Sequence, residues 1–143
     1  MFNLLVKDVM ERKKALILAP EATVREAAVL MAKKNVGAVM VVDKEHLRGI
    51  FTERDALFRV TARGLDAQTT QLVEVMTINP LTVDPGKSYG YALVMMQENG
   101  FRHAPVIENG KPIGIVSSRN AMDPDLEEFL SEANRREYIR AEK

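Results

Sequence analysis

A seven-residue pattern that could hold an anion occurs twice in the sequence, 65 residues apart. Each copy reads glycine, two apolar residues, a hydroxyl residue, two polar residues, and then a carboxylate or its amide. The copies run from Gly49 to Asp55 and from Gly114 to Asn120. The apolar part predicts the end of a buried strand, and the polar part predicts the start of a helix, where a hydroxyl and backbone N–H groups attract an anion. The same spacing is typical of an ordinary helix cap, so a structural role stays open.

The composition argues against several classes of function. The chain has 143 residues, is 46% hydrophobic and carries 20 basic and 20 acidic residues. Such a balance is ordinary for a globular protein and disfavours a general nucleic-acid binder. With no cysteine and only two histidines, far apart in the sequence, we expect no transition-metal site. The chain shows no Ser/His/Asp order, P-loop or dinucleotide fingerprint, so we expect that it is not an enzyme.

Nothing in the sequence resembles a targeting or membrane segment. Residues 1–6 are mostly apolar but too few for a signal peptide. The longest apolar runs have the length of a strand, far below a membrane span. We therefore expect no membrane association, and the absence of cysteine predicts a cytoplasmic protein.

The two motif copies belong to a longer internal repeat. Residues 20–57 align with residues 85–122 at a constant offset of 65 without a gap. Identical pairs include Pro20/Pro85, Ala27/Ala92, Val41/Val106, Gly49/Gly114, Ile50/Ile115 and Arg54/Arg119. Each half would bury only a marginal core alone. We therefore expect the halves to pack face to face around a pseudo-twofold axis.

Apolar periodicity and cap signals predict the same elements in each half. In the first half we expect a helix at 3–13, a strand at 15–18, a helix at 23–35, strands at 38–42 and 47–51, and a helix at 52–62. In the second half we expect a helix at 72–76, a strand at 81–83, a helix at 88–97, strands at 103–107 and 112–116 joined by a turn at 109–110, and a helix from 117. A last helix, 123–143, either packs on its own domain or contacts a second subunit. The chain thus divides at 1–64, 65–122 and 123–143.

This layout resembles a tandem pair of cystathionine-β-synthase (CBS) domains, the Bateman module, over nearly all of residues 1–122. The resemblance rests on Val9-Met10 and its repeat Val75-Met76, on residues 81–85 and 103–107, and on the two glycine–hydroxyl–carboxylate motifs. It implies an α/β protein of the α+β type, with two pseudo-twofold-related β-α-β-β-α repeats and a C-terminal helix. It also implies a sensor, because similar modules bind AMP, ADP, ATP, S-adenosylmethionine or, less often, NAD between the repeats.

The resemblance implies ligand-binding roles in the first motif that the residue types support. Asp55 can accept hydrogen bonds from both hydroxyls of a ribose. Thr52, one helical turn away, can meet a phosphate with its hydroxyl and nearby N–H groups. Arg54 adds a planar cation suited to phosphate, and Gly49 lets a ligand approach the backbone closely.

The second motif implies a weaker site, formed by Gly114, Ser117, Arg119 and Asn120. Asn120 can still bond a ribose hydroxyl, but it is neutral. An apolar slot for adenine is expected at the first strand of each repeat, around Ile17, Thr82 and Val83.

Arg102 and His103 stand where the first half has Gly37 and Ala38. In similar proteins, basic residues at this position point at ligand phosphates. We therefore expect the pair to assist the Asp55 site from across the cleft and to make the two sites unequal. The alternative is a surface arginine and a structural histidine.

Together these observations predict a stand-alone CBS pair that forms a homodimer shaped as a flat disc. We expect it to bind an adenine nucleotide and to change its conformation or its affinity for a regulated protein. AMP is the first candidate, with ATP, NAD and S-adenosylmethionine as further candidates. Two other functions stay open, namely a dimerisation module without a ligand and a regulator linked to nucleic acid.

Overall fold

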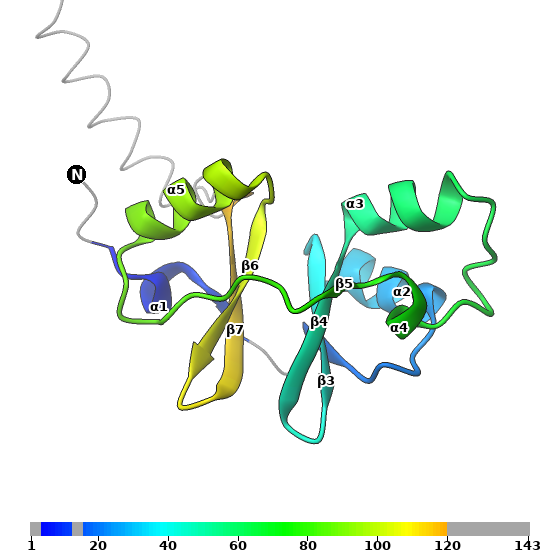
Figure 1. Cartoon of the computed structure of the whole chain (residues 1–143), viewed down its shortest axis with the longest axis horizontal. Coiled ribbons are helices and arrows are strands. Elements are labelled where there is room, and N and C mark those ends of the chain that lie inside the picture. Colours follow the sequence, from blue (N-terminus) through cyan, green and yellow to red (C-terminus); the bar gives the residue numbers. More distant parts are fainter. Residues whose placement is uncertain (1–3, 13–15, 120–143) are drawn as a thin grey trace, which may run out of the picture.

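The computed structural model describes residues 4–12 and 16–119, which form two halves lying side by side (Figure 1). The elements are, in order, α1 (Val6–Val9), β1 (Glu11–Arg12), β2 (Ile17–Leu18), α2 (Val24–Lys34), β3 (Ala38–Asp43), β4 (His46–Thr52), α3 (Glu53–Asp55), the π-helix η2 (Ala56–Thr61), α4 (Leu72–Val75), β5 (Thr77–Ile78), α5 (Tyr89–Asn99), β6 (His103–Glu108) and β7 (Lys111–Ser117). Asn120 and the predicted helix at 123–143 lie outside the described residues.

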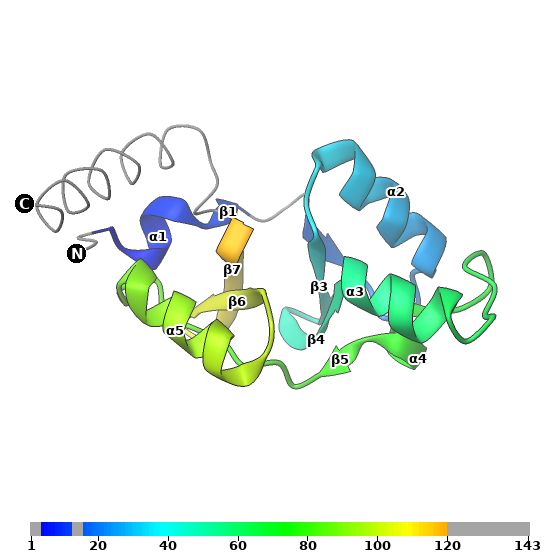
Figure 2. The ribbon, with the colours of Figure 1, turned by 90° about the horizontal axis from the view of Figure 1, so that it is seen from above.

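Each half is built on a hairpin within its own sheet. The first sheet has the strand order β2-β3-β4-β5, and the second has the order β1-β7-β6. The turn predicted at Asn109-Gly110 is confirmed, because both residues have positive φ (52° and 79°) and join paired strands, as two-residue hairpin turns require. With helices packed on both sheets, the protein has the α+β fold class predicted from the sequence (Figure 2).

The two halves also share a core. Leu16, Ala38, Met40 and Ile50 from the first half pack in one buried cluster with Ile115 from the second. Two further clusters lie within the halves, one around Phe51 and the other around Tyr89. Burying Ile115 against the first sheet removes apolar surface of both halves from water, which favours their face-to-face packing.

Short segments cross between the halves. β1 pairs with β7 of the second half, and Val6 and Met10 are buried in the second-half core. In the same way, β5 pairs with β4 of the first half, and α4 buries Leu72 and Val75 in the first-half core. Each sheet therefore gains an edge strand from a segment that the sequence repeat assigns to the other half (Figure 2). The sequence division at 64 stays a prediction.

The repeated glycines make room for these edge strands. A Cβ atom at Gly49 would lie 2.6 Å from the carbonyl oxygen of Thr77, and a Cβ atom at Gly114 would lie 2.5 Å from that of Glu11. Both distances are too short for a side chain. We expected Gly49 to admit a ligand, but its close neighbour in the structure is the backbone of β5.

Two expectations about elements were wrong, and one strand was not predicted. The helix predicted at 3–13 ends at Val9, because Met10 is extended and the next two residues pair with the edge of β7. The strand predicted at 81–83 is reduced to one bridge between Val83 and Val106. The strand β5, four residues earlier, was not predicted, because its partner β4 is distant in sequence and two residues show no alternation.

The helix predicted at 52–62 is present but changes its hydrogen-bond pattern. After α3 the chain forms the π-helix η2, and Ala62 donates to the carbonyl of Leu57, five residues back. Apolar periodicity does not distinguish this pattern from an α-helix over so few residues. The capping box predicted at Thr23 and Glu26 is confirmed, with bonds of 3.1 and 3.2 Å. Among the described helices, none is both long and apolar enough to cross a membrane.

Candidate functional site

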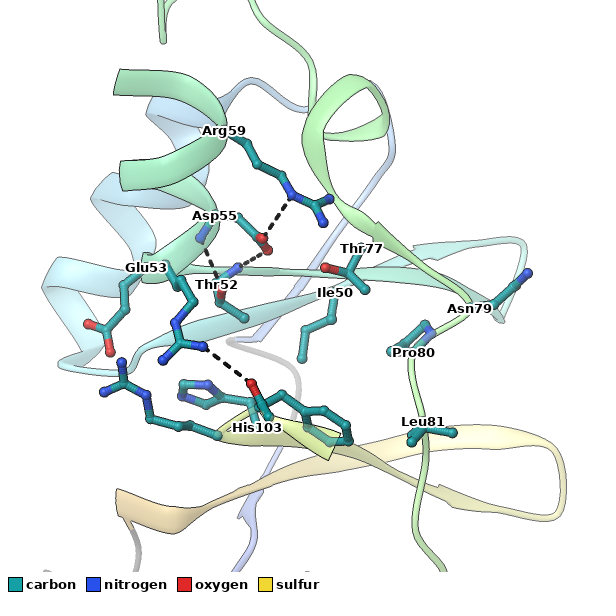
Figure 3. Close-up of a pocket in the computed structure, with 14 residues that line it drawn as sticks. Ile50, Thr52, Glu53, Asp55, Arg59, Thr77, Asn79, Pro80, Leu81 and His103 are labelled. Carbon is teal, nitrogen blue, oxygen red and sulfur yellow. Dashed lines mark hydrogen bonds and ion pairs between the residues drawn. The ribbon is translucent and has the colours of Figure 1, made fainter. Parts of the chain in front are cut away.

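A pocket of about 360 Å³ lies between the two halves (Figure 3). Its walls come from the end of β4 with α3 and η2, from β5 and the segment after it, and from the chain that enters β6. The lining residues are Ile50, Thr52, Glu53, Arg54, Asp55, Arg59, Thr77, Asn79, Pro80, Leu81, Gly100, Phe101, Arg102 and His103. The volume falls in the range of small-molecule sites, roughly 300–1,000 Å³.

Thr52 and Asp55 cap α3 and face this pocket together. The Thr52 N–H donates to Asp55 Oδ2 at 3.0 Å, and the Asp55 N–H donates to Thr52 Oγ1 at 3.2 Å. Asp55 is only 8% exposed, and its Oδ1 lies 3.5 Å from Arg59 Nε. The capping role that the spacing allowed is therefore present, and it holds a buried carboxylate at the pocket wall. A carboxylate accepts about four hydrogen bonds, so capacity remains for a ligand.

Arg54 lines the pocket and also joins the halves. Its Nη1 donates to the carbonyl oxygen of Gly100 at 3.2 Å. Arg119, at the matching position of the second half, donates to the carbonyl of Asn35 at 2.9 Å. Carbonyls at helix C-termini lack partners within the helix, and cations there are favourable. Arg54 therefore keeps some of its donors for a ligand while bracing the end of α5.

His103, the first residue of β6, is half-buried at the seam, which is the boundary where the two halves meet. A Cβ atom at Gly37 would lie 2.9 Å from both His103 Nε2 and Glu53 Oε1, so only glycine leaves room for both side chains. Burial lowers the pKa of His103 from 6.5 to about 4, with Arg102, Arg119 and Arg54 acting in the same direction and Glu53 opposing them. The ring is therefore uncharged at neutral pH. The positive charges that line the pocket belong to Arg54, Arg59 and Arg102.

The structure brings together five of the residues assigned to the site, Thr52, Arg54, Asp55, Arg102 and His103. The predicted adenine slot does not lie on this pocket. Ile17 pairs with Met40, Thr82 is exposed, and Val83 is buried in the second-half core.

The second motif lies apart from this pocket. Ser117 is buried, and its carbonyl accepts a bond of 2.8 Å from the Tyr89 hydroxyl. Gly114 packs against β1, and Arg119 braces α2. Asn120 falls outside the described residues, so a second site stays a prediction.

Sequence reasoning missed Arg59 and the connecting segment. The spacing of four residues between Asp55 and Arg59 could have identified an ion pair. The segment at 77–81 carried no such signal, because it meets the first motif only in the folded chain. It supplies Thr77 and Asn79 as polar groups, with Pro80 and Leu81 as apolar surface. The pocket thus combines a carboxylate, arginine donors and an apolar wall, which suits a ligand with hydroxyls, an anionic group and a flat apolar part.

Metal binding finds no support in the part of the chain that the structure describes. Residues 4–12 and 16–119 contain no group of three His, Asp or Glu side chains that could hold an ion. The acidic residues of the pocket, Glu53 and Asp55, are surrounded by Arg54, Arg59 and Arg102. This environment favours an anionic ligand over a cation.

Comparison with known proteins gives consistent matches. A profile of the CBS domain matches residues 6–62 and again residues 72–124. The CBS domain-containing protein YhcV of Bacillus subtilis is 38% identical over 112 residues, covering 78% of this chain and 79% of that protein.

Two solved structures share the fold. The CBS domain pair of protein MJ0100, in complex with 5′-methylthioadenosine and S-adenosyl-L-methionine, has a TM-score of 0.72 and 25% identity, covering 82% of this chain and 92% of that one. The hexameric CBS-CP12 protein from bloom-forming cyanobacteria has a TM-score of 0.76 and 27% identity, covering 87% of this chain and 68% of that one.

Proposed function

Because the chain belongs to the CBS domain family and carries the domain twice, we propose that it is a regulatory module that binds an adenine nucleotide in the pocket between its halves. AMP is the first candidate, and ATP, NAD and S-adenosylmethionine are the others. The complex of MJ0100 with two adenosyl ligands supports this class of ligand.

The observation that carries the proposal is the buried carboxylate of Asp55, 8% exposed, in a pocket that Arg54 and Arg102 also line. A buried carboxylate is stable where it is hydrogen-bonded or paired, and Asp55 keeps acceptor capacity for two ribose hydroxyls. The arginines supply planar donors for a phosphate. Apolar surface for a base is provided by Ile50, Pro80 and Leu81.

Regulation follows from the origin of the walls. Residues of both halves line the pocket, so a bound nucleotide contacts both sides of the seam. Such a ligand stabilises the arrangement of the halves that it fits best, and the population shifts toward that arrangement. A target protein that distinguishes the arrangements would then sense the nucleotide.

A thermal-shift panel of AMP, ATP, NAD and S-adenosylmethionine tests this function. A ligand at a hundredfold excess over its Kd stabilises the folded state by about 2.7 kcal/mol, and we expect the largest shift with AMP. Asp55→Ala should remove most of the shift. Asp43→Ala, in β3 and outside the pocket, is the matched control. No shift with any of the four would favour a dimerisation module without a ligand.

A homodimer is the expected assembly of this module. Large apolar side chains are exposed on α2, η2 and α5, including Val29, Leu57 (55%), Phe58 (58%), Tyr91 and Val94 (53%). η2 and α5 lie on the same side of the two sheets (Figure 1). A second copy packed on these helices would cover these side chains and remove their apolar surface from water. The CBS-CP12 neighbour is itself an oligomer.

A further inference from the structure

On the basis of the nucleotide site proposed above, we infer that Arg59 is a positioning residue that orients the Asp55 carboxylate toward a ribose diol and links it to the segment joining the two halves. Neither the repeated motif nor any comparison assigns a role to this arginine. It lies on η2, one turn after Asp55, and it lines the pocket.

The contacts of Arg59 fix its guanidinium from two directions, and Figure 3 shows the contact with Asp55. Nε lies 3.5 Å from Asp55 Oδ1. Nη1 donates to the carbonyl oxygens of Val75 and Met76, at 3.3 and 3.0 Å. These carbonyls end α4, where the chain lacks helical partners and a cation is favourable. The guanidinium is therefore held on the backbone of the connecting segment while another edge faces the carboxylate.

These contacts restrict the orientation of Asp55. Its Oδ2 accepts a bond from the Thr52 N–H, and its Oδ1 faces Arg59. With one protein partner at each oxygen, rotation of the carboxylate would break at least one contact. Each oxygen still has a free acceptor position. A diol has two donors at fixed separation, so it needs both oxygens held in place.

Arg59 also connects Asp55, where the ribose would bind, with the wall formed by residues 77–81. β5 begins directly after Met76, and Thr77, Asn79 and Leu81 line the pocket. A ligand that shifts Asp55 therefore also acts on the segment between the halves. Lysine would not reproduce this link, because its ammonium is a point charge without the planar fork that serves two directions.

The experiment measures binding of AMP and 2′-deoxy-AMP by isothermal titration calorimetry to the full chain and to Arg59→Met, Arg59→Lys and Arg63→Met. Arg63 lies four residues further on, is exposed and does not line the pocket, so it is the matched control. Loss of a hydrogen bond to a charged group predicts that wild type binds AMP about tenfold or more tightly than the deoxy ligand. In both Arg59 variants we expect this ratio to fall to about threefold or less, and in Arg63→Met to stay at the wild-type value.

The ratio of the two affinities is the informative quantity, because partial unfolding of a variant weakens both ligands equally. An unchanged ratio in both Arg59 variants would overturn the role of Arg59 while leaving the nucleotide site intact. A wild-type ratio near one would also overturn it, since Asp55 would then not read the diol. Failure of the wild type to bind either ligand would overturn the proposed function and this inference with it.

Discussion

The Arg54 guanidinium donates a hydrogen bond to the carbonyl oxygen of Gly100 across the boundary between the two halves, at 3.2 Å. Arg119 makes the equivalent bond to Asn35, at 2.9 Å. Both acceptors end a helix of the opposite half in the left-handed conformation. The repeated motif arginines therefore brace the pseudo-twofold packing, and the first of them does so from within the pocket.

Substitutions of Arg54 and Arg119 should distinguish the contribution of these residues to packing of the two halves from their contribution to ligand binding. Arg54→Met and Arg119→Met each remove one bond across the seam, and each should lower the free energy of unfolding by about 0.5–1 kcal/mol. Only Arg54 lines the Asp55 pocket, so only its loss should weaken the tighter AMP site, by about tenfold. Urea denaturation and calorimetry measure the two effects. Equal affinity losses in both variants would show that Arg54 acts on the ligand only through the fold.

Gly49 should be intolerant of a side chain for a reason unrelated to ligand binding. Gly49→Ala places a Cβ atom 2.6 Å from the Thr77 carbonyl oxygen and 2.7 Å from Met76 Sδ, so β5 must move. Overpacking of this kind costs about 1–3 kcal/mol. Gly90→Ala, in α5 with its nearest neighbour at 3.9 Å, should instead stabilise by about 0.4–1 kcal/mol. Denaturant midpoints test the opposite signs, and a neutral Gly49→Ala would contradict the packing role.

His103 should make the protein less stable in mild acid. Its pKa is about 4 in the folded chain and 6.5 as the ordinary value, so between these pH values the unfolded chain binds more protons. Stability attributable to this group is complete above pH 6.5 and declines as the pH falls toward 4, by at most about 1.4 kcal/mol per pH unit.

The unfolding free energies of wild type and His103→Gln, compared at pH 7 and pH 5, test this dependence. The difference between the two pH values should be smaller in the variant. His46→Gln, at the exposed start of β4, is the matched control and should follow the wild type. The same pH dependence in all three proteins would exclude burial of a neutral His103 as its cause.

The exposed apolar side chains of α2, η2 and α5 should form the contact between two copies of the chain. Phe58→Glu places a charge on a side chain that is 58% exposed, and in a dimer its burial would be unfavourable. We expect the variant to be monomeric by light scattering at concentrations where the wild type is a dimer. Ile78→Glu, on the edge strand β5 and 64% exposed, is the control and should remain dimeric. A monomeric wild type would remove the basis of the homodimer.

The sequence by itself determined the features that depend on local spacing. The offset of 65 identified the repeat, and the family resemblance drawn from it is confirmed. Hydroxyl–carboxylate spacing identified the caps at Thr23 and Thr52, because a side chain reaches a backbone N–H three residues away whatever the rest of the chain does. The hairpin turn at Asn109-Gly110 was equally local.

Only the tertiary structure decided which residues face one another across the seam. β5 has two residues and no periodicity of its own, and it is a strand because Gly49 lets it approach β4. That pairing places Leu81 on the pocket in place of the predicted Thr82 and Val83, and it brings the Met76 carbonyl to Arg59. Contacts between residues distant in sequence depend on the packing of both halves, and no local pattern encodes them.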